Sequence, residues 1–292
     1  MGQFSGRASP LRASQRAPAR QPNPHSALLQ AAQLAVNLPK LTAHDAASLQ
    51  GITEEMLMGT RPDAALVTNQ NAPENSGKLL LVHGYCSGGV WPTNHFTNAS
   101  TFLDANQNRS HDQFANLIRN HGAQFPSFGV VAHSQGGAAS LHLYTYYWSG
   151  LDYSTGSRLI QSVGTPYQGT ALAGSLAMIG SVFGAGCGTN WDLTYDGAAL
   201  WLAGIPSWAK SRVYYSTTAF TDVWWRYDYC HLATDAFLSD PEDGTTERAY
   251  GQLPGANNMG HKTGWCHTAG MRDPAQYTDS SRNSNMNTYA NR

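Results

Sequence analysis

Short runs of apolar residues, separated by stretches of helical periodicity, follow one another along the chain from about residue 65 onward. Four of them have the length of strands: 78–82 (KLLLV), 128–132 (FGVVA), 157–163 (SRLIQSV) and 212–217 (RVYYST). We expect a further short strand at 101–103. Runs that are apolar on both faces are typical of strands in a parallel sheet, because helices cover both sides of such a sheet.

Helices are expected between these strands. Ser110 and Gln113 have the spacing of a capping box, the residues that follow place their apolar side chains on one face, and Gly122 suits the end of that helix. A second helix is expected from about 135 to 148. The alternation of strand and helix predicts an α/β fold with a mostly parallel central sheet and flanking helices.

The chain is expected to contain one folded domain, at residues 65–292, with a small helical insertion at about 170–210, where Gly, Ala, Leu and Trp are frequent. Residues 1–64 are expected to be a flexible or partly ordered segment, because the first 40 residues contain no Asp or Glu and few large apolar side chains. No secretory signal is visible, since the apolar stretch 27–36 is interrupted by two glutamines.

Composition and charge narrow the function classes. Of the 292 residues 41% are hydrophobic, as in a globular protein, but only 13% are charged, about half the usual share. A net charge of -1 without a basic stripe gives no reason to expect nucleic acid as a partner. Low charge with many Gly, Asn, Ser, Thr and Tyr residues is more typical of secreted enzymes, so we expect an extracellular location. No apolar run approaches the ~18 residues of a transmembrane helix.

The chemistry is expected at residues 132–137 (AHSQGG), directly after the strand FGVVA and before a helix. A nucleophile on a sharp strand-to-helix turn needs very small neighbours two positions before and after it, which Ala132 and Gly136 provide. Ser134 is therefore the predicted catalytic nucleophile. The alternative is a buried serine in a tight helix start without activity.

A second motif, residues 83–89 (HGYCSGG), follows the strand KLLLV. In α/β-hydrolases this loop supplies one backbone N–H of the oxyanion hole, and the residue after the nucleophile supplies the other. We therefore assign the oxyanion hole to the backbone N–H groups of Tyr85 and Gln135. We expect His83 to brace its loop by hydrogen bonding rather than to act as a base.

These motifs resemble the core of bacterial secreted lipases, whose nucleophile turn is often Ala-His-Ser-x-Gly, and residues 164–169 (GTPYQG) resemble the Gly-Thr-Pro-His-x-Gly segment of that superfamily. The resemblance covers roughly residues 78–170 and implies an α/β-hydrolase fold. Further segments, including YYWSGLD, GCGTNWDLTYDGA and HKTGWCHT, are similar to the conditioned medium factor family, a secreted signalling factor of social amoebae and its bacterial relatives. This second resemblance implies secretion and leaves open whether catalysis is the main role.

The catalytic acid and base must follow Ser134 in the chain. In the lipases that the chain resembles, the catalytic acid follows the next-to-last strand, often as Asp-Gly, and this resemblance assigns the acid to Asp243. In the same lipases the last strand begins with Gly-Ala-x-Asn and is closed by a His, and this resemblance favours His267 over His261 as the base. The base takes the Ser134 proton and the acid holds its tautomer. The rival acids stay open: Asp222, Asp228, Asp235 and Asp240.

The four cysteines fit two disulfides or four thiols. If the triad is placed correctly, Cys86 in the oxyanion loop and Cys266 beside the catalytic His start close together, so we expect the pairs Cys86–Cys266 and Cys187–Cys230.

The remaining features concern substrate binding and cofactors. Trp224 and Trp225, with polar flanks, are candidate substrate-binding residues. No motif indicates a metal or a cofactor, so none is expected.

Three function classes remain. The first is a serine-dependent carboxylic-ester hydrolase, a lipase or esterase that acts on lipid or polyester substrates through an acyl-enzyme. The second is an acyltransferase that uses the same triad and excludes water. The third is a secreted signalling or binding factor that keeps a lipase fold without turnover. Reactivity toward a fluorophosphonate separates the first two from the third, and transfer to alcohols separates the first from the second.

Overall fold

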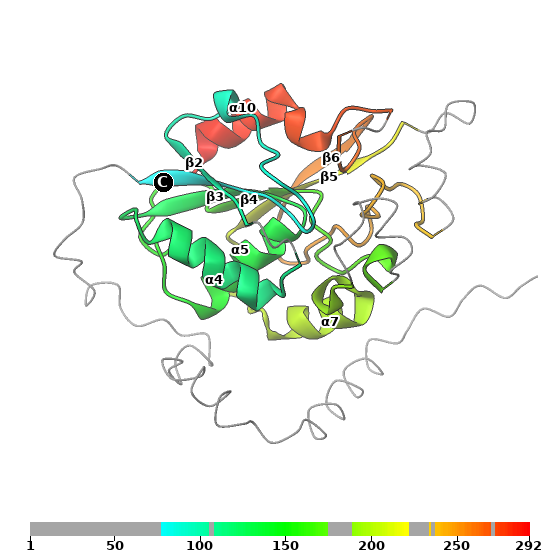
Figure 1. Ribbon diagram of the computed structural model, residues 1–292, viewed down its shortest axis with the longest axis horizontal. Coiled ribbons are helices and arrows are strands. Elements are labelled where there is room, and N and C mark those ends of the chain that lie inside the picture. Colours follow the sequence, from blue (N-terminus) through cyan, green and yellow to red (C-terminus); the bar gives the residue numbers. More distant parts are fainter. Residues whose placement is uncertain (1–76, 105–107, 175–188, 222–233, 235–236, 270–271) are drawn as a thin grey trace, which may run out of the picture. The chain divides into compact units, whose positions relative to one another are not determined.

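The computed structural model describes residues 77–104, 108–174, 189–221, 234, 237–269 and 272–292. These residues form a six-stranded sheet in the order β2-β1-β3-β4-β5-β6, in which every neighbouring pair is parallel (Figure 1). The strands are β1 (Lys78–Val82), β2 (Ala99–Phe102), β3 (Phe128–His133), β4 (Ile160–Val163), β5 (Val213–Ala219) and β6 (Asn257–Thr263). The predicted α/β-hydrolase class, with its mostly parallel sheet and flanking helices, is confirmed.

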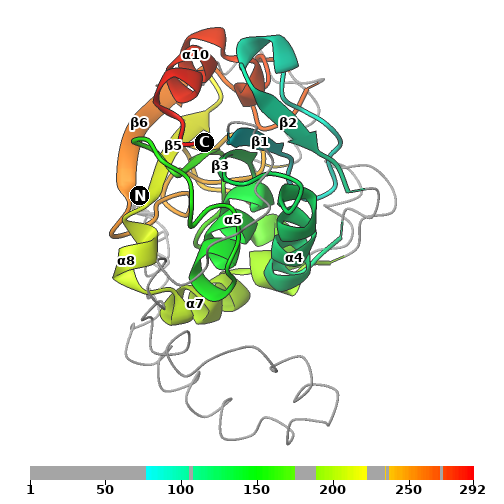
Figure 2. The ribbon, with the colours of Figure 1, turned by 90° about the vertical axis from the view of Figure 1, so that its left-hand side faces the viewer.

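Helices cover both faces of the sheet (Figure 2). The α-helices are α4 (His111–Gly122), α5 (Gln135–Tyr146), α7 (Tyr195–Gly204), α8 (Ser207–Lys210) and α10 (Ser280–Tyr289). The short 3-10 helices are η2 (Thr93–His95), η3 (Ala171–Gly174), η4 (Trp191–Leu193) and η5 (Gln276–Thr278). Helices α4 and α5 lie on one face of the sheet, and α10 lies on the other.

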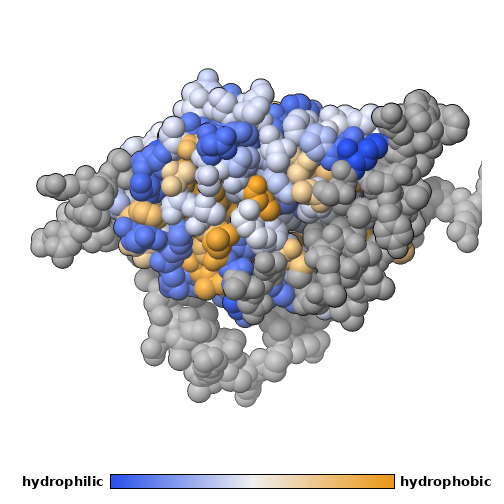
Figure 3. Space-filling view, turned by 45° about the horizontal axis from the view of Figure 1, so that its top comes forward, coloured by the Kyte–Doolittle hydropathy of each residue, from blue (hydrophilic) through white to orange (hydrophobic). Residues whose placement is uncertain are grey.

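The apolar run KLLLV explains this layering. Leu80 and Val82 pack in a cluster with residues of α4 and α5, whereas Leu79 and Leu81 pack in a second cluster with Met286 of α10. Successive residues of a strand point to opposite faces, so only a strand that is apolar at every position can serve two helical layers. The outer side of α10 is polar, and the surface of this face is mostly hydrophilic with small hydrophobic patches (Figure 3).

The predicted elements differ from the observed ones mainly at their ends. Ser110 and Gln113 form the predicted capping box. Gly122 is the last residue of α4, as predicted, and it also allows close packing, because a Cβ at this position would lie 2.3 Å from Cε1 of Phe128. The strand expected at 157–163 begins only at Ile160.

The described part of the predicted insertion at about 170–210 contains the helices η3, η4, α7 and α8, joined by short non-helical stretches. The segment 1–64 lies outside the described residues, so its predicted flexibility and the domain start at residue 65 stay predictions. Within the described ranges, no helix combines the length and the apolar character needed to cross a membrane. Because all six strands are parallel, their carboxyl ends meet at one edge of the sheet, and the loops that follow them gather there.

Candidate active site

Ser134 stands at the carboxyl end of β3, where the chain turns directly into α5. Its backbone has φ 53° and ψ −134°, and it is one of three non-glycine residues with positive φ in the described part of the chain. A non-glycine residue in a sparsely populated backbone region costs of order 1–3 kcal/mol and is typical of functional sites. Its N–H donates to the Val163 carbonyl at 3.1 Å, and the residue is buried.

Small neighbours make this turn sterically feasible. A Cβ on Gly84 would lie 2.4 Å from the Cβ of Ser134, and a Cβ on Gly136 would lie 2.3 Å from the carbonyl oxygen of His83. Real Cβ atoms do not approach other atoms so closely, so both glycines are needed where the two loops meet. This close packing is the reason why the motif AHSQGG has very small residues on either side of Ser134.

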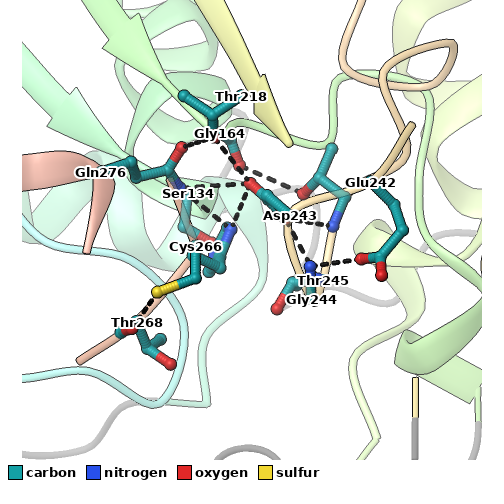
Figure 4. Close-up of polar contacts among 12 residues, drawn as sticks. Ser134, Gly164, Thr218, Glu242, Asp243, Gly244, Thr245, Cys266, Thr268 and Gln276 are labelled. Atoms are coloured by element: carbon teal, nitrogen blue, oxygen red, sulfur yellow. Dashed lines mark hydrogen bonds and ion pairs between the residues drawn. The ribbon is translucent and has the colours of Figure 1, made fainter. Parts of the chain in front are cut away.

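His267 and Asp243 form a buried hydrogen-bonded pair. Nδ1 of His267 lies 2.9 Å from Oδ2 of Asp243, and both side chains are 1% exposed. The backbone N–H of His267 also donates to the Asp243 carbonyl at 2.7 Å. Oδ1 of Asp243 accepts the backbone N–H groups of Thr245 at 3.0 Å and Thr246 at 2.7 Å (Figure 4). The carboxylate is therefore held from both sides, with one oxygen directed at the imidazole.

The two residues come from loops at the same edge of the sheet as Ser134. Asp243 lies between β5 and β6, and His267 follows β6. The expectation that this His closes the last strand is wrong, because β6 ends at Thr263 and His267 lies four residues later. The His267 ring lies 4.6 Å, centroid to centroid, from the ring of His133, the residue directly before Ser134.

The rival residues do not share this arrangement. His261 lies within β6, its Nδ1 is 2.9 Å from Oγ1 of Thr217, and burial lowers its pKa. Asp240 is exposed in the loop before Asp243. The other rival acids, Asp222, Asp228 and Asp235, lie outside the described residues.

The proposed oxyanion donors flank Ser134. Gln135 is the first residue of α5, so its backbone N–H has no partner within the helix. The Gln135 side chain is turned away from the site, since its Nε2 donates to the Arg109 carbonyl at 2.7 Å. Tyr85 is buried and lines a narrow pocket together with Ser134. The prediction that His83 braces its loop is confirmed, because its Nδ1 contacts the Gly84 carbonyl and its Nε2 accepts the Asp104 N–H.

The pocket beside Ser134 is mostly apolar. Its lining residues come from the oxyanion loop, the segment after β4, the helical insertion and the Asp243 loop: Tyr85, Pro166, Thr170, Leu172, Ala173, Asn190, Leu193 and Thr245. The segment after β4 also supports the turn, since Oγ1 of Thr165 donates to the Ser134 carbonyl at 2.7 Å. The candidate binding residues Trp224 and Trp225 lie outside the described residues.

The predicted pair Cys86–Cys266 is wrong. Cys266 is not in a disulfide; its thiol contacts the carbonyl oxygens of Thr268 at 2.9 Å and Asp273 at 2.7 Å. The reason is the direction of the side chain: the Cys266 sulfur points away from Asp243 and toward the carbonyl oxygen of Thr268 (Figure 4).

Cys86 is disulfide-bonded, but its partner is not Cys266. The predicted pair Cys187–Cys230 lies outside the described residues. Among the described residues, no group of three or more His, Cys, Asp and Glu side chains could hold a metal ion.

Sequence reasoning missed Gln276, a fully buried side chain at the centre of the site. Its Nε2 lies 3.2 Å from Oδ2 of Asp243, 3.1 Å from Nδ1 of His267 and 3.1 Å from Nε2 of His133. Its position nine residues after His267, in a polar segment near the end of the chain, carries no motif that would have singled it out.

Comparisons with known proteins show the family of the chain. A family model described as "Conditioned medium factor C-terminal domain" matches residues 74–290. The conditioned medium factor of Dictyostelium discoideum is 47% identical over 243 residues, which are 82% of this chain and 34% of that protein. The chain thus spans about one third of the length of this curated relative.

Two solved structures share the fold. The mature form of a Bacillus licheniformis lipase is similar with a TM-score of 0.50 and 15% identity, covering 68% of this chain and 87% of that chain. A metagenomic carboxyl esterase is similar with a TM-score of 0.50 and 18% identity, covering 90% of this chain and 86% of that chain. Identities this low show the fold alone, so the chemistry rests on the site.

Proposed function

Because the chain belongs to the conditioned medium factor C-terminal domain family and has the fold of lipases and esterases, we propose that it is a serine-dependent carboxylic-ester hydrolase. The observation that carries the proposal is the buried His267–Asp243 pair at the same sheet edge as Ser134 on its strained turn. A serine with ordinary packing needs neither a positive φ nor a neighbouring acid–base pair.

In this mechanism Oγ of Ser134 attacks the ester carbonyl carbon while Nε2 of His267 takes the hydroxyl proton. The negative charge that develops on the carbonyl oxygen is stabilised by the backbone N–H groups of Tyr85 and Gln135. The C–O bond to the alcohol then breaks, and His267 returns its proton to the leaving alcohol oxygen. Water attacks the resulting acyl-enzyme through the same steps, which releases the acid and regenerates Ser134.

Asp243 keeps the Nδ1 proton on His267, so that Nε2 is the free base, and it stabilises the imidazolium that forms. The side chains around Ser134 are mostly apolar, which favours an apolar acyl group, as in a lipid or polyester, on this side of the ester bond. An extracellular location is supported by the name of the Dictyostelium relative and by the disulfide at Cys86.

A fluorophosphonate probe tests the proposal. The wild-type chain should be labelled covalently, and Ser134→Ala should abolish both the labelling and the hydrolysis of p-nitrophenyl esters, with a loss of about 10⁶-fold in kcat. Ser140→Ala is a matched control, since this buried serine of α5 donates only to the Gly136 carbonyl at 2.7 Å. Labelling that survives Ser134→Ala would contradict the proposal.

The name of the Dictyostelium relative favours a second candidate, a secreted signalling factor that keeps the fold without turnover. An unlabelled, correctly folded wild-type chain would support this alternative. If the chain is labelled, the product decides between the two enzymatic classes: release of free acid from p-nitrophenyl esters, triglycerides or polyesters indicates a hydrolase, and acyl transfer to an added alcohol in preference to water indicates an acyltransferase.

A further inference from the structure

Backbone hydrogen bonds hold Gln276 in place, independently of the contacts that its side chain makes. Its N–H donates to the Cys266 carbonyl at 2.8 Å, next to His267 in the chain, and Ala275 forms a parallel bridge with Cys266. Arg282 of α10 donates from Nη2 to the Gln276 carbonyl. The segment that carries Gln276 is thus hydrogen-bonded to the segment that carries His267, which fixes the position of the glutamine backbone relative to the histidine.

The amide has one favourable orientation. Its Oε1 accepts the hydroxyl proton of Thr218 at 2.5 Å, and its Nε2 faces Oδ2 of Asp243 at 3.2 Å (Figure 4). Reversing the amide would place Oε1 against the carboxylate, two acceptors in contact without a proton between them. The hydrogen-bond partners therefore assign the NH₂ group to the Asp243 side.

One Nε2 proton of Gln276 goes to Oδ2 of Asp243 at 3.2 Å, and the same nitrogen lies 3.1 Å from Nε2 of His133. The third neighbour, Nδ1 of His267 at 3.1 Å, carries a proton that it donates to the same Oδ2, so it is a contact rather than an acceptor. Asp243 then accepts two backbone N–H groups on Oδ1 and two side-chain N–H groups on Oδ2, which occupies all four of its acceptor positions.

His133 is held neutral in this arrangement. Burial lowers the pKa of its imidazole well below the ordinary value, with the nearby His267 as a further cause. Nε2 of His133 lies 3.1 Å from Nε2 of Gln276, and the His133 ring also makes a hydrogen bond with the backbone of His267. A neutral ring at 4.6 Å does not repel the imidazolium that His267 becomes during catalysis, whereas a charged ring would.

The backbone leaves a space for this amide. Gly164, at the end of β4, has φ +62°, and a Cβ there would lie 2.0 Å from Nε2 of Gln276. Any other residue at 164 would expel the amide from its place between Asp243 and His133.

We propose that Gln276 is a positioning residue of the active site. Its amide fixes the rotation of the Asp243 carboxylate, and thereby keeps the proton of His267 on Nδ1 and its Nε2 available to Ser134. The inference rests on the proposed hydrolase function for its kinetic part, but the hydrogen-bond geometry can be tested without turnover.

The kinetic test compares Gln276→Leu, Gln276→Glu and the control Gln161→Leu with p-nitrophenyl butyrate. Gln161 is also a buried glutamine, and its Nε2 donates to the Met286 carbonyl at 2.7 Å on the α10 side of the sheet. We expect Gln276→Leu to lower kcat by about 10²-fold with KM within about twofold, because a small misplacement of the base has an effect of this size. Gln161→Leu should lower Tm and leave kcat unchanged.

Gln276→Glu supplies a readout that a purely structural role would not move. An ionised carboxyl group at this position opposes Asp243, whereas a protonated one donates to it again. The ratio of the kcat of Gln276→Glu to that of the wild type should therefore rise as the pH falls. A ratio that is independent of pH, together with a kcat for Gln276→Leu within about threefold of wild type, would overturn the inference.

A measurement on the resting protein separates the two proposals. The Nδ1 proton of His267, bonded to Asp243, should give a low-field proton NMR signal that is absent in His267→Ala and weakened by exchange in Gln276→Leu. If the wild-type chain hydrolyses no ester but shows this behaviour, the proposed function fails and the role of Gln276 stands. If Gln276→Leu leaves the signal unchanged, the role of Gln276 fails whatever the activity.

Discussion

Replacing Asp243 by asparagine exchanges one oxygen of the carboxylate for an NH₂ group, and the structure dictates where that group goes. Oδ1 accepts the backbone N–H groups of Thr245 and Thr246 at 3.0 and 2.7 Å. An NH₂ group at that place would face two donors, so the amide oxygen takes the Oδ1 position. The NH₂ group then faces Nδ1 of His267 and Nε2 of Gln276.

Two consequences follow, and each has a magnitude. Nδ1 of His267 must now accept a proton rather than donate one, so the ring carries its proton on Nε2 and cannot take the proton of Ser134. In a protease triad this wrong tautomer alone costs about 10⁴-fold in kcat, or about 5 kcal/mol. The NH₂ group and Gln276 Nε2 are two donors in contact at a buried site, which should lower the free energy of unfolding by about 1–3 kcal/mol.

The assay is the steady-state hydrolysis of p-nitrophenyl butyrate, with urea unfolding measured on the same preparations. Asp240→Asn is the matched control, because Asp240 is exposed in the same loop and should change neither kcat nor stability. If Asp243→Asn keeps more than about a tenth of the wild-type kcat, the tautomer argument is refuted. If activity falls only together with the folded fraction, Asp243 serves the fold and not the reaction.

The choice of base gives the next prediction: His267→Ala should abolish turnover, and His261→Ala should leave most of it. The opposite ranking of the two kcat values would reject the pairing of His267 with Asp243. Cys266→Ser should keep activity and Tm near wild type because the hydroxyl can make the same donation, whereas Cys86→Ser should lower the unfolding free energy by about 2–5 kcal/mol; equal losses would contradict this. Burial lowers the pKa of His111 to about 3, so the unfolded chain binds a proton there that the folded chain does not, and urea unfolding should lose up to about 1.4 kcal/mol per pH unit below pH 6.5. His111→Gln should remove that part of the slope.

The sequence by itself determined the sheet and the nucleophile turn. Strand β1 is apolar from Leu79 to Val82 and β3 from Phe128 to Ala132, a pattern that only a sheet covered on both faces accommodates, and the bounds of both strands match the predicted ones within one residue. The turn at Ser134 is specified by small neighbours that a tight strand-to-helix junction requires. Both signals are local, since they arise from periodicity and steric limits among residues close in the chain.

The tertiary structure alone decided which polar groups meet. Asp243 had rivals of equal local quality, and only the fold places its carboxylate 2.9 Å from His267. Cys266 was expected to face Cys86, but its thiol contacts the carbonyl oxygens of Thr268 and Asp273, and spacing along the chain does not say which way a side chain turns. Gln276 has no motif at all, because its role depends on contacts with residues up to 143 positions away, and such contacts exist only once the loops have come together at the carboxyl ends of the strands.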